Sequence, residues 1–167
     1  MRKQFALAAA SAVMMITSAA GTASAQAPVG AGGGAPVVAT AGGVFPNVDS
    51  GKCIDAAWSH TNGTAVTQWD CYGGATQSWS WSNGQLVNAD SGKCLDAGWS
   101  HTNGTAVTQW DCYGGATQSW GVALTFSGWQ IINNDSGKCL DASWSQANGT
   151  TLVQWDCYGG ATQLWRL

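Results

Sequence analysis

The sequence predicts an all-β domain made of three copies of one structural unit. A string over residues 90–120 occurs three times. The copy at 49–79 differs from it only by Ile54 and Ala57, and the copy at 135–165 keeps its length and frame with seven changes. Because self-similarity at a fixed period of this size is the signature of a repeat architecture, the fold follows from one unit.

The first 25 residues have the features of a secretory signal peptide. Arg2 and Lys3 form a basic start, residues 5–20 are apolar, and 23–25 are the small residues that a signal peptidase accepts. A membrane anchor would need about 20 apolar residues without that small-residue exit. We therefore expect a secreted protein of bacterial type, extracellular or periplasmic, with no membrane span.

The rest of the chain divides into a short linker or tail and one domain. Residues 26–43 are rich in Gly and Ala and carry no charge, as flexible linkers do. Residues 44–167 are long enough to bury a core of their own. We place the repeats at about 44–82, 83–124 and 125–167.

Charge and cysteine content exclude several classes of function. The net charge is −3 and every acidic residue is Asp, so there is no basic surface for nucleic acid or anionic membranes. In a secreted protein, equal spacing of the Cys favours disulfides within each repeat. A zinc site is not expected, because His60 and His101 have no counterpart in the third copy, which carries Gln146. We expect neither metal nor cofactor. The expected pairs are Cys53–Cys71, Cys94–Cys112 and Cys139–Cys157.

Each unit contains four short strand-like runs separated by turn residues, about twelve strands in all. Asp-Ser-Gly between two apolar runs indicates a hairpin, and Asn103-Gly104 and Gly114-Gly115 suit turns with positive φ. In the second unit the expected strands are 85–89, 93–97, 106–111 and 119–122. The Trp-Asp dipeptides are like those of propellers, but a propeller needs four to eight blades. Three units close instead into a β-trefoil, a pseudo-threefold barrel with hairpins capping one end.

Four motifs recur in every unit: Cys-x-Asp, Asn-Gly-Thr, Trp-Asp-Cys and Gln-x-Trp. Together they resemble the ricin B-type lectins, whose domain also occurs as a carbohydrate-binding module attached to bacterial xylanases. The resemblance covers residues 44–167. It implies a β-trefoil with one disulfide per lobe and up to three sugar pockets.

A shallow sugar pocket needs an aromatic plate for the C–H face of the ring and a carboxylate for its hydroxyls. The residues that match the family's carboxylate are Asp55, Asp96 and Asp141. Those that match its stacking aromatic are Trp69, Trp110 and Trp155. The resemblance also gives sugar contacts to Tyr72, Tyr113 and Tyr158, and a supporting role beside the site Asp to Gln77, Gln118 and Gln163.

Other repeated residues have structural or open interpretations. The resemblance places Trp79, Trp120 and Trp165 in the core. Either an extra sugar platform or a lid on the core is expected of Trp58, Trp99 and Trp144. The Asp-Ser-Gly acids are expected to form turns, and the Asp before the second Cys to cap its loop.

Two departures from the family pattern bear on affinity. Thr76, Thr117 and Thr162 replace an Asn that contacts sugar in relatives. Two residues before the stacking Trp, relatives often carry a Gln, and this chain has Thr67, Thr108 and Val153 there. We expect the third pocket to differ from the other two.

The expected function is therefore that of a non-catalytic lectin for galactose-type or xylan-type glycans. A glycoside hydrolase would need two carboxylates in distinct roles, whereas each Asp here is triplicated. A trefoil that binds a protein, as inhibitors do, is the alternative, but such proteins lack the Gln-x-Trp repeat.

Overall fold

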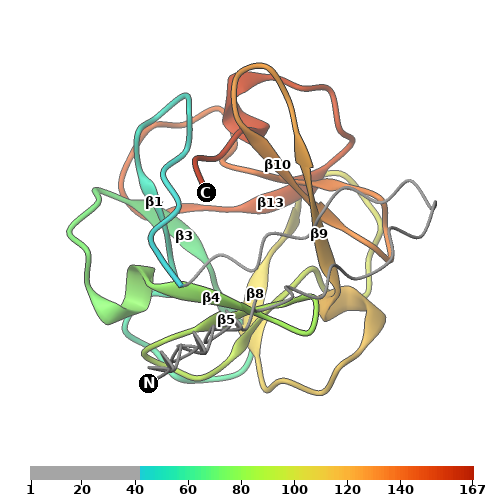
Figure 1. Cartoon of the computed structure of the whole chain (residues 1–167). Coiled ribbons are helices and arrows are strands. Elements are labelled where there is room, and N and C mark those ends of the chain that lie inside the picture. The colour runs from blue at the N-terminus through green and yellow to red at the C-terminus, as the bar shows by residue number, and fades with distance from the viewer. Residues whose placement is uncertain (1–41) are drawn as a thin grey trace, which may run out of the picture. The chain divides into compact units, whose positions relative to one another are not determined.

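The computed structural model describes residues 42–167, so the predicted signal peptide and nearly all of the predicted linker lie outside the described residues. This part of the chain is a β-trefoil with one disulfide per repeat, as predicted (Figure 1). The strands form one three-stranded and two five-stranded sheets, each of which includes a strand from a neighbouring repeat. The repeats are therefore interlocked.

The strands follow the repeats along the chain. The first repeat contains β1 (Cys53–Asp55), β2 (Thr64–Ala65), β3 (Thr67–Trp69) and β4 (Trp79–Ser82). The second contains β5 (Gln85–Asn88), β6 (Cys94–Asp96), β7 (Thr105–Ala106), β8 (Thr108–Trp110) and β9 (Trp120–Leu124). The third contains β10 (Trp129–Asn133), β11 (Cys139–Asp141), β12 (Thr150–Thr151) and β13 (Val153–Trp155).

Thirteen strands are present in residues 42–167 rather than about twelve, partly because the strand predicted at 106–111 is divided. β7 pairs with β13 of the third repeat, whereas β8 pairs with β6 of its own repeat. At the break the backbone N–H of Val66 donates to Val107, Val107 to Leu152 and Leu152 to Val66, each at 2.9 Å. This closed ring of three hydrogen bonds joins the repeats at the pseudo-threefold axis.

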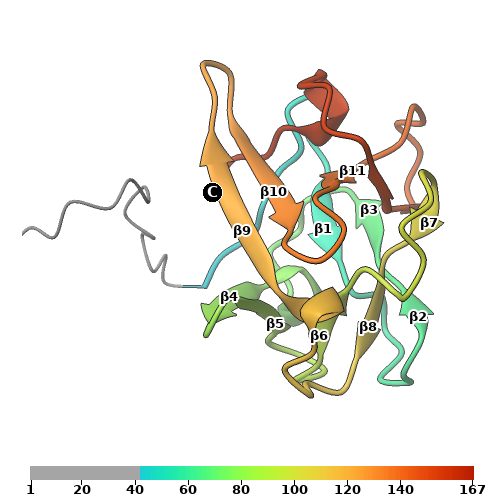
Figure 2. The same cartoon turned by 90° about the vertical axis from the view of Figure 1, so that its right-hand side faces the viewer.

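Two hairpins connect consecutive repeats, and the chain ends build a third. β4 and β5 are joined through Asn83 and Gly84, whose φ angles of 49° and 78° match a tight hairpin turn. β9 and β10 lie side by side as the longest hairpin (Figure 2). In the third position Asn47 bridges to Trp165, so the two ends of the described chain close the ring without a covalent turn.

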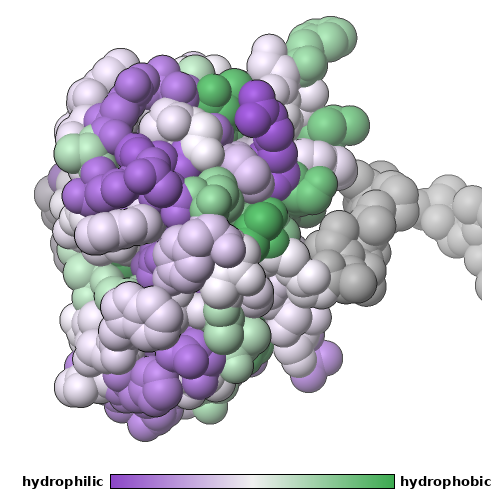
Figure 3. All heavy atoms as spheres, turned by 90° about the vertical axis from the view of Figure 1, so that its left-hand side faces the viewer, coloured by the Kyte–Doolittle hydropathy of each residue, from purple (hydrophilic) through white to green (hydrophobic). Residues whose placement is uncertain are grey.

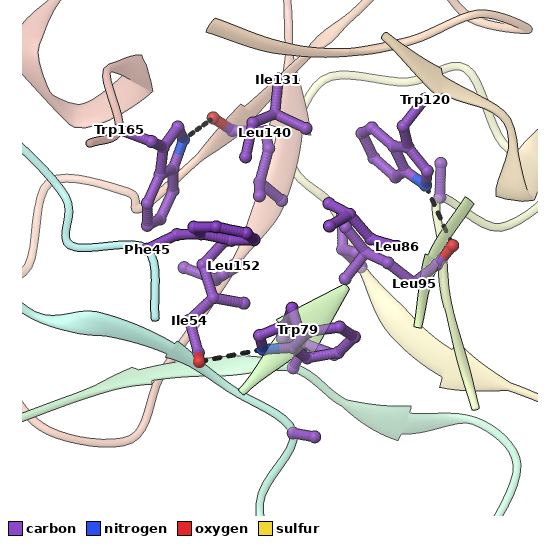
Figure 4. Packing of buried hydrophobic residues seen from close by; sticks show 14 of the residues in the cluster. Phe45, Ile54, Trp79, Leu86, Leu95, Trp120, Ile131, Leu140, Leu152 and Trp165 are labelled. Carbon is purple, nitrogen blue, oxygen red and sulfur yellow. Dashed lines mark hydrogen bonds between the residues drawn. The ribbon is translucent and has the colours of Figure 1, made fainter. Parts of the chain in front are cut away.

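The core is threefold as well. Trp79, Trp120 and Trp165 are at most 2% exposed, and the Nε1–H of each donates to the carbonyl of a β-strand residue at 2.9–3.1 Å (Figure 4). A buried Tyr or Trp needs such a partner for its polar group. Phe45 from the N-terminal segment lies among them and takes the position that Leu86 and Ile131 have in the other two repeats (Figure 4).

The loop predicted at 112–118 ends in a short 3₁₀ turn. The same turn occurs in every repeat, as η1 (Ala75–Gln77), η2 (Ala116–Gln118) and η3 (Ala161–Gln163). Within residues 42–167, no helical segment has the length and hydropathy of a membrane-spanning helix.

Candidate functional site

A cavity of about 390 Å³ opens between residues of the first repeat and a loop of the third. Its lining consists of Asp55, Ala57, Trp58, Thr67, Trp69, Tyr72 and Gly149. The sheet brings the two motifs together, since β1 pairs with β3 so that Asp55 lies opposite Thr67 and Cys53 opposite Trp69. The Cys53–Cys71 disulfide joins the first residue of β1 to the residue two positions after the end of β3. The predicted Asp, Trp and Tyr of this repeat thus line one cavity.

Asp55 lies at the inner end of the site with only 4% of its surface exposed. Its Oδ1 accepts the backbone N–H of Ala57 at 2.7 Å, and its Oδ2 accepts the Tyr72 hydroxyl at 3.1 Å. A carboxylate has about four acceptor positions, so two remain for a ligand. Asp96 and Asp141 make the same two contacts in their repeats.

The contact with the backbone depends on a left-handed residue two positions after the Asp. Ala57 has φ 58° and Ser143 has φ 61°, while the second repeat has Gly98 at φ 69°. Residues with a Cβ pay about 1–2 kcal/mol to adopt this conformation. Strain of this kind, retained in two of three copies, is typical of functional sites.

Tyr72 is half-exposed and its hydroxyl lies between Asp55 and the buried Thr76. Desolvation raises the pKa of the Tyr72 phenol above its usual range, and the Asp55 charge acts in the same direction. The phenol therefore stays protonated at neutral pH and donates a hydrogen bond to Asp55. A Cβ on Gly74 would lie 2.3 Å from the Tyr72 ring, so a glycine is required beneath it.

Trp69 presents an open face and receives support from another repeat. It is 44% exposed, and its equivalents Trp110 and Trp155 are 43% and 39% exposed. A Cβ built on Gly149 of the third repeat would lie 3.5 Å from the Trp69 ring, in ordinary van der Waals contact. Gly63 and Gly104 lie in the same way against Trp110 and Trp155. Each Asn-Gly-Thr loop therefore completes the pocket of a neighbouring repeat.

Trp58 lies on the rim of the cavity. It is 79% exposed and stacks on Tyr72 with ring centroids 6.4 Å apart and an interplanar angle of 16°. The alternative that this Trp covers the core is wrong, because the core lies elsewhere and the indole faces solvent. Trp99 and Trp144 stack on Tyr113 and Tyr158 in the same manner.

The Gln of Gln-x-Trp supports the Tyr loop more than the Asp. In the first repeat Gln77 Nε2 donates to the Asp70 carbonyl at 2.9 Å and its Oε1 accepts the Tyr72 N–H at 2.8 Å. The predicted contact with the site Asp occurs in the second repeat, where Gln118 Nε2 lies 3.1 Å from Asp96 Oδ2. The other two copies lack that contact.

The Thr that stands where relatives have Asn bonds the Tyr of its own repeat, at Thr76, Thr117 and Thr162. They are at most 4% exposed, and each hydroxyl bonds the neighbouring Tyr hydroxyl. The Tyr hydroxyl therefore occupies the polar position next to the site Asp. Thr67 does line the cavity, and Val153 at the same register has a methyl group in place of the hydroxyl.

The remaining Asp residues join repeats to one another. Asp90 and Asp135 contact His60 and His101, and Asp49 accepts Gln146 at 3.0 Å, so each bond crosses a repeat boundary. These Asp lie in turns as predicted, but the side chains that hold the turns are those of Asn residues such as Asn47.

The prediction that the Asp before the second Cys caps its loop is wrong. Asp70 pairs with Lys52, and it also accepts Asn148 Nδ2 of the third repeat at 2.8 Å. The hydrogen bond from Lys52 has the larger effect and that from Asn148 the smaller, and together they hold the pKa of the Asp70 carboxyl below its usual range. Asp111 and Asp156 have the same environment.

Sequence reasoning missed the Gln that precedes each platform Trp. Gln68, Gln109 and Gln154 are fully buried. Gln109 Nε2 donates to the carbonyls of Ala56 and Ser59, at both ends of the loop that carries Trp58. The available signal was strand alternation, which directs this Gln away from the face of the exposed Trp and into the interior.

Most of the face drawn in Figure 3 is covered by hydrophilic and intermediate residues, and hydrophobic residues gather toward one side. Within residues 42–167, no group of three or more His, Cys, Asp or Glu side chains is arranged to hold a metal ion. The site is thus one of aromatic faces, one carboxylate and hydroxyls.

Comparison with known proteins agrees with the β-trefoil fold. The model of the ricin-type beta-trefoil lectin domain matches residues 41–165. The designed 3-fold symmetric protein ThreeFoil is 31% identical, with a TM-score of 0.71 over 75% of this chain and 96% of its own. An exo-β-1,3-galactanase from Clostridium thermocellum is also 31% identical, with a TM-score of 0.71, and the match covers 77% of this chain and 30% of the enzyme.

A lectin solved with a sugar has the same fold at lower identity. The Macrolepiota procera ricin B-like lectin, in complex with lactose, is 20% identical, with a TM-score of 0.67 over 79% of this chain and 97% of its own. A search of the curated proteins found no match. Because the family model spans well over half of the sequence, the chain belongs to the ricin-type β-trefoil lectin domain family.

Proposed function

We propose that the protein is a secreted, non-catalytic lectin that binds glycans through three pockets, one in each repeat. The observation that carries the proposal is the cavity in which Asp55, the exposed Trp69 face and the Tyr72 hydroxyl converge. Hydrogen-bonding groups beside an aromatic face suit a pyranose, which has hydroxyls on its edge and C–H groups on its face. The second and third repeats carry the same residues in the same contacts.

The proposed ligand class is galactose-type or xylan-type glycans. Support comes from the family, from the galactanase whose 31%-identical segment has the same fold, and from the lactose complex of a lectin with this fold. Three pockets on one rigid body raise avidity for a polymer without new contacts.

A non-catalytic role is supported by the carboxylates of the site. Among the described residues that line the cavity, Asp55 alone has a carboxylate. In most families, glycoside hydrolysis uses a pair of carboxyl groups that lie about 5–10 Å apart in different environments. Secretion is supported by the three disulfides, which persist in oxidising compartments.

A glycan array probed with the purified protein tests this proposal. We expect signals on glycans that expose galactose or xylose, and retention of the protein on immobilised galactan or xylan that free sugar releases. An array without signals, together with specific capture of one protein from the native medium, would favour the protein-binding alternative. Release of reducing sugar from either polymer would contradict the non-catalytic role.

A further inference from the structure

Each pocket carries a second exposed aromatic residue that the core does not need. Trp58, Trp99 and Trp144 are 79%, 82% and 79% exposed, about twice as much as the platform Trp of the same repeats. An indole left this exposed gains little from burial in the folded chain. Its presence at the same position of all three repeats therefore calls for an explanation outside the core.

The loop that carries Trp58 is fixed in place. Gln109 holds the carbonyls of Ala56 and Ser59, one on each side of Trp58, at 2.6 Å each. Between them the N–H of Ala57 donates to Asp55, and the Trp58 ring rests on Tyr72. A rigid aromatic side chain loses little conformational entropy when a ligand covers it, which favours binding.

Two separate aromatic surfaces thus line one cavity. The first is Trp69, and the second is the stacked pair Trp58–Tyr72, to which Trp69 does not belong. Asp55 is linked directly to the second surface by the Tyr72 hydroxyl. One sugar ring on Trp69 leaves the Trp58 surface free for the next ring of a chain.

We infer that Trp58, Trp99 and Trp144 form a second sugar platform at each pocket, so that the preferred ligand is a linear saccharide of two or more pyranose rings. This inference rests on the proposed lectin function and adds the length of ligand that each site accepts. A terminal monosaccharide would use the Asp55 and Trp69 part of the site alone.

Titration calorimetry with saccharides of increasing length tests the inference. The probes are the mono-, di- and tetrasaccharides of β-1,4-linked xylose and of β-1,3-linked galactose. The wild-type protein is compared with a triple variant, Trp58→Ala, Trp99→Ala and Trp144→Ala, which removes exposed side chains and should fold. A matched control is Phe126→Ala, since Phe126 is fully exposed in the β9–β10 loop and does not line the cavity.

We expect the wild-type protein and the Phe126→Ala control to bind the tetrasaccharide about tenfold more tightly than the monosaccharide, a difference of about 1.4 kcal/mol. The triple variant should keep the monosaccharide affinity and lose this gain, and Trp58→Tyr with the same change at the other two positions should restore part of it. A gain that persists in the triple variant, as bridging between pockets would produce, overturns the inference. Equal affinity of the wild-type protein for all lengths also overturns it and leaves the lectin function standing, whereas no binding of any probe at millimolar concentration contradicts the lectin function itself.

Discussion

Nε2 of Gln109 lies 2.6 Å from the carbonyl oxygen of Ala56, although Gln109 belongs to the second repeat and Ala56 to the first. Gln154 makes the same contact with Ala97, and Gln68 with Ala142. Every pocket loop is therefore held by a buried amide from an adjacent repeat. Closure of the trefoil and the shape of the pockets depend on the same hydrogen bonds.

Replacement of this amide should destabilise the fold. For Gln109→Ala we expect the free energy of unfolding to fall by about 2 kcal/mol, because two inward-facing carbonyls lose their donor. Urea denaturation measures the change. Gln146→Ala is the control, since Gln146 is exposed and makes one bond to Asp49, and its effect should stay within about 0.5 kcal/mol. Equal effects of the two variants would show that the buried amide has no special role.

The repeat pattern predicted the fold, the disulfides and the family because it appears three times and only a threefold barrel closes with three units. The contacts between repeats were not predictable in the same way. The residue that Gln109 contacts lies 53 positions away, and no local pattern identifies it. The split of the 106–111 strand has the same origin, since β7 and β8 pair with different neighbours.

The roles of polar residues were predicted unevenly. Short-range rules placed Asp49 in a turn, where it lies, but they did not predict that Asn47 holds the turn or that the Asp49 side chain bonds Gln146 of the third repeat. Likewise the exposure of Trp58 depends on how the loop is anchored, which the sequence alone does not show. Residues that act inside one hairpin were predicted better than residues that act between repeats.

The left-handed residue after the site Asp gives a test of local strain. Ala57→Gly should raise the free energy of unfolding by about 1 kcal/mol, because Gly adopts φ 58° without the steric cost of a Cβ. Gly98→Ala should lower it by a similar amount, since Gly98 has φ 69° and an added Cβ would make only an ordinary van der Waals contact with Thr105, at 3.8 Å. Thermal and urea unfolding measure both. Changes of the opposite sign would contradict the assigned backbone conformation.

The residue that pairs with the site Asp across the two strands should determine how the pockets differ in sugar affinity. Thr67→Val and Thr108→Val convert the first two pockets to the form of the third, and we expect affinity to fall by several-fold, about 1 kcal/mol per lost hydrogen bond. Val153→Thr should strengthen the third pocket. Calorimetric titration with the best glycan of the array measures these effects. Unchanged affinity in all three variants would remove this position from the site.

Stability should depend on pH through the paired surface carboxylates. The Lys bonds lower the pKa of Asp70, Asp111 and Asp156 in the folded state. A carboxyl group whose pKa is lower in the folded state than in the unfolded state stabilises the fold at pH values above its unfolded pKa of about 3.9. This stabilisation is lost as the pH falls through the folded pKa. Unfolding by urea between pH 6 and pH 2 measures this.

The variants that separate this effect from general acid sensitivity replace Lys52, Lys93 and Lys138. Changed together to Met, they should flatten the loss of stability below pH 4, whereas changes to Arg should preserve it. An acid profile that is the same in the Met and Arg variants would contradict the assignment to these pairs.

The most direct test of the central claim is a calorimetric titration that compares two sets of three Asp→Asn substitutions. One set removes the site carboxylates Asp55, Asp96 and Asp141, and the other removes Asp70, Asp111 and Asp156, which lie outside the lining of the cavity and are about 70% exposed. Circular dichroism establishes that both variants are folded. We predict that the first set abolishes binding of the array's best glycan and that the second binds it like the wild-type protein. Undiminished binding by the first set would contradict the account.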